Sequence, residues 1–122
     1  MISWSRIDHV QLPIPPGTEP EARKFYGGIL GFEQIPKPAS LQQNGGCWFR
    51  AGEIELHLGV EASHDQRSKQ HVALEVANLL AVREGLEAHD VVIQEETPIP
   101  GRERFSFRDP FGNRIEVIER TS

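Results

Sequence analysis

The stretch DHVQL at residues 8–12 decides the fold, because it returns as QHVAL at residues 70–74. Each stretch alternates polar and apolar residues, which is the pattern of a strand with one buried face. A second pair of strand-like stretches, IEL at residues 54–56 and IEV at residues 115–117, closes the two halves at nearly the same offset. The chain is therefore an internal repeat whose halves begin and end on related strands.

Between these strands, each half carries one helical pattern and turn residues that separate further strands. We predict helices over residues 19–29, with Pro20 in the first turn, and over residues 79–88, with Asn78 as the N-cap. The predicted strands cover residues 8–12, 33–36, 47–51 and 53–59 in the first half and residues 70–74, 91–96, 104–108 and 113–119 in the second half.

The predicted fold class is α+β. Two βαβββ half-repeats, residues 1–60 and 68–122, are expected to form one domain, joined by a polar linker over residues 61–67. We expect them to build a cup-shaped, mostly antiparallel sheet with the helices on its outer face. Two segments, residues 37–44 and 97–102, are expected to be loops that line a pocket.

Composition excludes several functions. A chain of 122 residues fits a single domain, and its net charge of -5 argues against a nucleic-acid partner. No apolar run is long enough for a membrane span, and the N-terminus lacks the pattern of a secretory signal, so we expect a cytoplasmic location. Cys47 is the only cysteine, so a metal would have to use histidines and carboxylates.

Strand alternation places candidate metal ligands on one face of each half. His9 and Gln11 share a face, opposite Asp8, and His71 lies on the corresponding face of the second half. If an approximate two-fold relates the halves, two imidazoles and two carboxylates converge, a donor set that suits Mn, Fe, Co, Ni or Zn. The four candidate ligands are His9, Glu55, His71 and Glu116.

The fourth ligand is open between two residues of one strand. His57 shares the face of Glu55 and can replace it, whereas the repeat equivalence of Glu55 with Glu116 favours Glu55. Trp48 is read either as a wall of the substrate pocket or as a core residue. The residues expected to contact substrate are Gln11, Trp48, Arg50, His57 and Arg114.

Four motifs together resemble the vicinal oxygen chelate superfamily, which includes glyoxalase I, fosfomycin and bleomycin resistance proteins and extradiol dioxygenases. The motifs are IDHV at residues 7–10, ARKFY leading to LGF at residues 22–32, HVALEV at residues 71–76 and DPFGNRIE at residues 109–116. The resemblance implies a divalent metal that binds two adjacent oxygens of a small substrate. It also implies that the paired halves can come from two chains, which predicts a homodimer.

Carried onto this sequence, the resemblance matches His9, His71 and Glu116 to the most regular ligand positions, and Glu55 to the fourth ligand of glyoxalase-type members. The expected function is a metal-dependent enzyme of the lyase or isomerase type, with Glu55 or Glu116 as the base. The alternatives are a ring-cleaving dioxygenase, a binding protein of the bleomycin-resistance type, and a polar face that only mediates dimer contact.

Overall fold

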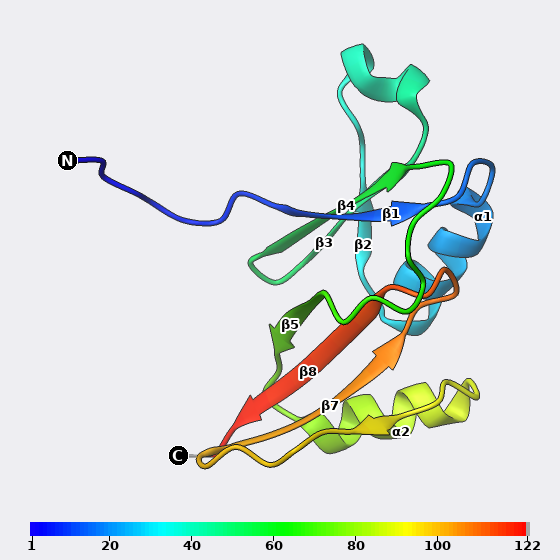
Figure 1. The fold of residues 1–122 in the computed structure, drawn as a ribbon. Helices are drawn as coiled ribbons and strands as arrows, with labels where there is room; N and C mark the ends of the chain where they lie inside the picture. The colour runs from blue at the N-terminus through cyan, green and yellow to red at the C-terminus, as the bar shows by residue number, and fades with distance from the viewer. Residues whose placement is uncertain (122) are drawn as a thin grey trace. The chain divides into compact units, whose positions relative to one another are not determined.

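The computed structural model describes residues 1–121 (Figure 1). The chain forms two compact units, Met1–Ser63 and His64–Ser122, which we call the N-terminal and the C-terminal unit and describe separately. Each unit contains one four-stranded mixed sheet and one main helix in the order βαβββ. The predicted α+β class and the two half-repeats are thus confirmed.

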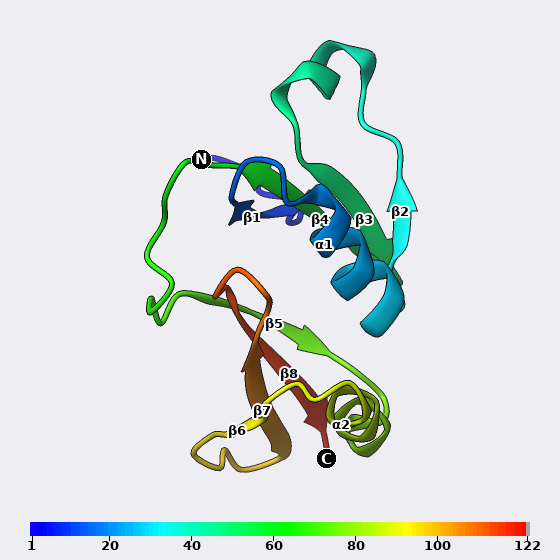
Figure 2. The same ribbon diagram turned by 90° about the vertical axis from the view of Figure 1, so that its right-hand side faces the viewer.

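In the N-terminal unit the strand order is β1-β4-β3-β2, with β1 parallel to β4 and the other neighbours antiparallel. The predicted helix begins as α1 and continues as a π-helical segment, η1, which contacts β2 and β3 (Figure 2). Part of the expected loop at residues 37–44 forms a 3₁₀ helix, η2. The bounds are β1 Val10–Ile14, α1 Glu19–Ala22, η1 Arg23–Ile29, β2 Glu33–Ile35, η2 Ala39–Asn44, β3 Cys47–Ala51 and β4 Ile54–Val60.

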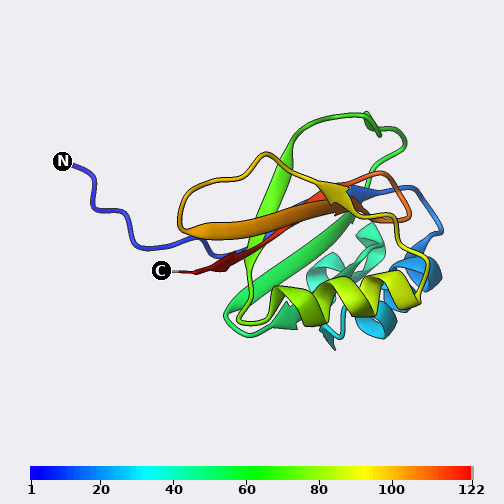
Figure 3. The same ribbon diagram turned by 90° about the horizontal axis from the view of Figure 1, so that it is seen from below.

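In the C-terminal unit the strand order is β5-β8-β7-β6, with β5 parallel to β8 (Figure 1). Helix α2, the yellow-green helix of Figure 3, covers the predicted residues and contacts β8. Its N-cap is Asn78, whose side chain accepts a hydrogen bond from the backbone N–H of Ala81. The bounds are β5 His71–Glu75, α2 Leu79–Ala88, β6 Gln94–Glu95, β7 Arg102–Arg108 and β8 Arg114–Arg120.

Strand β6 is much shorter than the predicted strand over residues 91–96. The backbone N–H of Val91 donates to the carbonyl of Leu86 and so closes the end of α2. This hydrogen bond holds Val91 at the end of the helix, and in strand β6 Gln94 and Glu95 pair with β7.

One face of each sheet is apolar and packs on its own helix, while the other face carries the polar candidates. In the N-terminal unit the core includes Tyr26, whose ring centroid lies 5.8 Å from that of Phe49. In the C-terminal unit Phe105, Ile115 and Val117 are buried. This burial, at about 25 cal/mol per Å² of apolar surface, is what fixes which side of each strand faces outward.

The turn between β7 and β8 is locked by Asp109. Its Oδ1 accepts hydrogen bonds from the backbone N–H groups of Phe111 at 2.9 Å and Asn113 at 2.8 Å, and its Oδ2 accepts one from the Asn113 side chain. Gly112 adopts φ of 91°, which favours glycine. The turn thereby positions the first residues of β8, which carry candidate site residues.

None of the helices in the described part of the chain has the length and apolar character needed to cross a lipid bilayer.

Candidate metal and ligand site

The N-terminal unit brings all of its sequence-predicted site residues onto one face of its sheet. His57 is paired in register with Gln11 on β1 and with Trp48 on β3, and Glu55 is paired with Arg50. His9 precedes β1 and its ring stacks on that of His57. The residues on this face are His9, Gln11, Trp48, Arg50, Glu55 and His57.

His57 lies at the centre of a stack of three rings. Its centroid is 3.6 Å from that of Trp48 and 4.0 Å from that of His9, and only 4% of the residue is exposed. Its Nε2 lies 2.9 Å from Oε1 of Glu55, whose other oxygen is 3.9 Å from the Arg50 guanidinium. Glu55 therefore fixes the orientation of the His57 ring.

The nitrogen Nδ1 of His9 is tied back to its neighbour in the chain. It lies 2.9 Å from Oδ2 of Asp8, and this hydrogen bond is the main reason why the pKa of the Asp8 carboxyl is lowered. Because the ionised carboxylate only accepts, Nδ1 is the donor in this bond, and Nε2 is the ring nitrogen outside it. Asp8 was expected on the opposite side of the strand, but β1 begins at Val10 and the strand alternation does not extend to residue 8.

His71 of the C-terminal unit is also held through its Nδ1. This nitrogen lies 3.0 Å from the carbonyl oxygen of Lys69, which can only accept, and 3.3 Å from Nη1 of Arg114, which can only donate. Arg114 also donates to the same carbonyl at 3.1 Å. The other ring nitrogen, Nε2, lies 3.5 Å from Oε1 of Glu116.

The pair formed by His71 and Glu116 has the spacing of two ligands of one ion. Divalent metals bind imidazole nitrogen and carboxylate oxygen at about 2.0–2.2 Å, which sets neighbouring donors about 3.0–3.5 Å apart. The separation of 3.5 Å fits that range. Within residues 1–121, however, no three His, Cys, Asp or Glu side chains are grouped as a metal site, so further donors must join this pair.

Two features of the observed geometry would have to change on metal binding. The rings of His9 and His57 are nearly parallel, with an interplanar angle of 17°. An ion lies close to the plane of each imidazole that binds it, so these two rings cannot bind the same ion until one rotates. In the C-terminal unit, Oε1 of Glu116 is already 2.9 Å from Nη1 of Arg104.

A partly buried ionic network on the polar face of the C-terminal sheet contains residues that the sequence reading missed. Glu96 Oε1 accepts hydrogen bonds from the Ser106 hydroxyl at 2.7 Å and from Arg114 at 2.6 Å, and these two partners lower the pKa of Glu96. Arg104 pairs with Glu116. Alternation along residues 104–108, which puts Arg104 and Ser106 on one face, is the sequence signal that identifies them.

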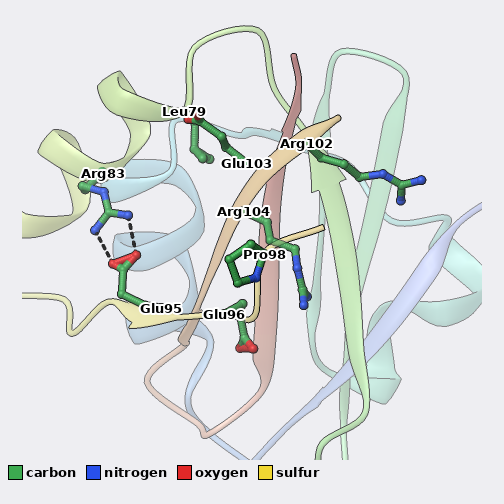
Figure 4. Close-up of a pocket in the computed structure, with 8 residues that line it drawn as sticks. All are labelled: Leu79, Arg83, Glu95, Glu96, Pro98, Arg102, Glu103 and Arg104. Atoms are coloured by element: carbon green, nitrogen blue, oxygen red, sulfur yellow. Dashed lines mark hydrogen bonds and ion pairs between the residues drawn. The ribbon is translucent and has the colours of Figure 1, made fainter. Parts of the chain in front are cut away.

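A pocket of about 250 Å³ adjoins this network within the C-terminal unit (Figure 4). Arg83 and Glu95 form a bidentate ion pair on one of its sides. The lining residues are Leu79, Arg83, Glu95, Glu96, Pro98, Arg102, Glu103 and Arg104.

A family model described as the Glyoxalase/Bleomycin resistance protein/Dioxygenase superfamily matches residues 6–117. The chain belongs to this superfamily. The resemblance drawn from the four motifs is thus confirmed.

Solved structures of the superfamily agree with the fold. A protein from Bacillus anthracis, provisionally assigned to the glyoxalase family, is 40% identical with a TM-score of 0.92, and the match covers 98% of this chain and 99% of that one. The fosfomycin resistance protein FosX from Listeria monocytogenes, in a complex with Mn(II) and 1S,2S-dihydroxypropylphosphonic acid, is 19% identical with a TM-score of 0.78, covering 94% and 92% of the two chains. The FosX likeness concerns the fold alone. No curated protein matches this chain.

Proposed function

We propose that this protein is a divalent-metal-dependent enzyme of the lyase or isomerase type that acts on a small substrate with two adjacent oxygens. The observation that carries the proposal is the matched state of His9 and His71. Each imidazole has an acceptor within 3.0 Å of its Nδ1, just before or at the start of its own strand, so Nε2 is the nitrogen that each would offer to an ion.

The proposed ligands are His9, His71 and Glu116, with the fourth donor taken from β4, either Glu55 or His57. The spacing of 3.5 Å between His71 and Glu116 supports this assignment. A divalent ion held by these donors would act as a Lewis acid toward the substrate oxygens, and Mn, Fe, Co, Ni and Zn all suit the donor set. The presence of Mn(II) in FosX, a member of the same superfamily, supports a divalent metal in general terms.

Glu55 is the better placed of the two candidate bases. Its carboxylate is partly open to solvent, with 28% of the side chain exposed, whereas only 6% of the Glu116 side chain is exposed. Oε1 of Glu55 also lies 2.9 Å from Nε2 of His57, a contact that orients the carboxylate. We assign substrate contacts to Gln11, Trp48, Arg50, His57 and Arg114, all of which border the candidate ligands on the two polar faces.

The proposal takes donors from both units, because two of the proposed ligands, His71 and Glu116, belong to the C-terminal unit. Those donors meet either within one chain or between two copies, and we propose a homodimer. Light scattering on the purified protein, with and without bound metal, measures the molecular mass of the assembly. A monomer that binds metal at full occupancy would contradict the dimer while leaving the metal site intact.

A non-catalytic ligand-binding protein is the second candidate, and a specific feature of the geometry favours it. Glu116 is paired with Arg104, and His57 is stacked on Trp48, so both donors are already satisfied inside their own units. Polar faces of this kind would bind a flat or anionic ligand without a metal ion. A ring-cleaving dioxygenase is a variant of the metalloenzyme and would require ferrous iron.

The deciding experiment is metal content, measured by plasma mass spectrometry on protein purified without an affinity tag and after reconstitution with Mn, Fe, Co, Ni or Zn. The wild type is expected to hold close to one ion per site, and His71→Ala and Glu116→Gln are expected to lose it. His89→Ala, at the far end of α2, is the control that removes an imidazole elsewhere. If the wild type takes up none of the five metals, the metalloenzyme is excluded and the ligand-binding protein becomes the better account.

A further inference from the structure

Arg104 is held in place independently of its carboxylate partner. Its Nε and Nη2 donate to the backbone carbonyl of Thr97 at 3.1 Å and 2.8 Å, and its Nη1 donates to Oε1 of Glu116 at 2.9 Å. The carbonyl anchors one edge of the planar guanidinium, so the charged head stays where it is even when Glu116 is withdrawn. A guanidinium has five N–H donors, and two remain for another ligand.

The oxygen of Glu116 that Arg104 holds is the same oxygen that faces His71. Oε1 lies 2.9 Å from Arg104 and 3.5 Å from Nε2 of His71. An ion bound through this oxygen would share it with Arg104, because a carboxylate oxygen has two lone pairs. Sharing the negative charge with a divalent ion would weaken the ion pair and let the guanidinium take a further anionic partner.

The net charge of the network then becomes positive. As observed, the guanidinium groups of Arg104 and Arg114 balance the carboxylates of Glu96 and Glu116. A divalent ion adds two positive charges to a site in which the Arg104 side chain is only 16% exposed. Uncompensated charge in such surroundings is costly, and an anionic ligand relieves it.

The free side of Arg104 is reachable by a small molecule. Arg104 lines the pocket of about 250 Å³ together with Glu96 and Pro98 (Figure 4). This volume lies below the range of about 300–1,000 Å³ that drug-sized ligands need, so it suits a small group. Arginine is the side chain that best binds a carboxylate, phosphate or phosphonate through two parallel hydrogen bonds.

From these observations we propose that Arg104 exchanges partners: it neutralises Glu116 in the metal-free protein and binds a second, anionic group of the substrate once Glu116 binds the metal. The inference rests on the proposed metal site and deepens it, because it names the substrate class. That class comprises small molecules with two adjacent chelating oxygens and a further carboxylate, phosphate or phosphonate.

Isothermal titration calorimetry with Mn²⁺, lactate and malate tests the exchange. Lactate and malate both chelate a divalent ion through a hydroxyl and a carboxylate, and malate carries one more carboxylate. The Mn²⁺-loaded wild type is expected to bind malate about tenfold more tightly than lactate, the effect of one charge-assisted contact. Arg104→Gln is expected to lose that preference and to bind Mn²⁺ itself several-fold more tightly, because Glu116 no longer has a competing partner.

Arg120→Gln is the matched control. It removes the same charge from the same unit and breaks an ion pair with another carboxylate, that of Glu75, at a residue of β8 that is not among those lining the pocket. It is expected to keep the preference for malate and to change Mn²⁺ affinity less than Arg104→Gln does. Arg104→Lys keeps the charge without the planar fork, and thermal unfolding of each variant verifies that the C-terminal unit is folded.

The outcomes separate this inference from the function on which it rests. A wild type that binds no Mn²⁺ overturns both. A wild type that binds Mn²⁺, with equal affinities for malate and lactate or with a malate preference that survives in Arg104→Gln, overturns the partner exchange alone and leaves the metal site standing.

Discussion

His57 occupies in the N-terminal sheet the position that Glu116 occupies in the C-terminal sheet. In the N-terminal sheet, Val10 follows His9 and pairs with Leu56, the residue before His57. In the C-terminal sheet, Val72 follows His71 and pairs with Ile115, the residue before Glu116. The two residues are also alike in burial, at 4% and 5% exposed. Glu55, which the sequence offset matches to Glu116, takes the register position of Arg114 instead.

This equivalence predicts that His57 is the fourth ligand, once its ring rotates out of the stack with His9. Pulsed electron paramagnetic resonance of the Cu²⁺-loaded protein is expected to detect three imidazoles in the wild type, two in His57→Ala and three in Glu55→Ala. Two imidazoles in the wild type would contradict the prediction and return the fourth position to Glu55.

Removing the carboxylate of Asp8 should weaken metal binding although Asp8 is not itself a ligand. The carboxylate holds the proton on Nδ1 of His9, and loss of such a partner typically costs about 10–100-fold in metal affinity. Calorimetric titration of Asp8→Ala with Mn²⁺ measures the loss. Asp65→Ala, which removes a carboxylate from an exposed loop, should bind Mn²⁺ as the wild type does, and equal losses in both variants would point to net charge as the cause.

The carboxylate of Glu19 should make the stability of the N-terminal unit depend on pH. The backbone N–H of Gly46 donates to its Oε2 at 2.9 Å, and this bond is the main cause of its lowered pKa. Because the folded-state pKa lies below the ordinary value of 4.5, the stabilisation is present above that pH and is lost as the pH falls through the lowered pKa.

At neutral pH, Glu19→Gln is therefore expected to lower the free energy of unfolding by about 0.5–1 kcal/mol, and the difference from the wild type should vanish in acid. Urea titrations at about pH 7, 5 and 3 measure it. Glu21→Gln removes a carboxylate from the same helical turn without touching Gly46 and serves as the control. A difference for Glu19→Gln that stays constant across the series would show that the lost bond does not depend on ionisation.

Gly46→Ala should be among the most destabilising small substitutions in the N-terminal unit. Gly46 adopts φ of 82°, and a Cβ there would meet the carbonyl oxygen of Leu58 at 2.1 Å, so the backbone of β4 would have to shift. We expect a loss of about 2–4 kcal/mol in the free energy of unfolding. Gly85→Ala in α2, where a Cβ meets nothing within 4 Å, should instead stabilise by roughly 0.4–1 kcal/mol. Similar melting temperatures for the two variants would refute the steric argument.

The sequence by itself determined the repeat, the order of the elements and the polar face of each sheet. Alternation of polar and apolar residues fixes the side on which His9, His71 and Glu116 lie, because burying the apolar face leaves no choice of side. The extent of α2 and its N-cap at Asn78 were likewise predictable, since helix period and capping are local properties.

Only the tertiary structure decided how the halves correspond and which groups are bonded. The offset between equivalent residues is 62 for His9 and His71 but 59 for His57 and Glu116, so counting along the chain at one constant offset misaligns the two closing strands. The ion pair of Arg104 with Glu116 depends on the same register, because diagonal neighbours on adjacent strands meet only after the strands have paired. Hydrogen bonding between strands is a long-range property, and the order of residues along the chain does not specify it.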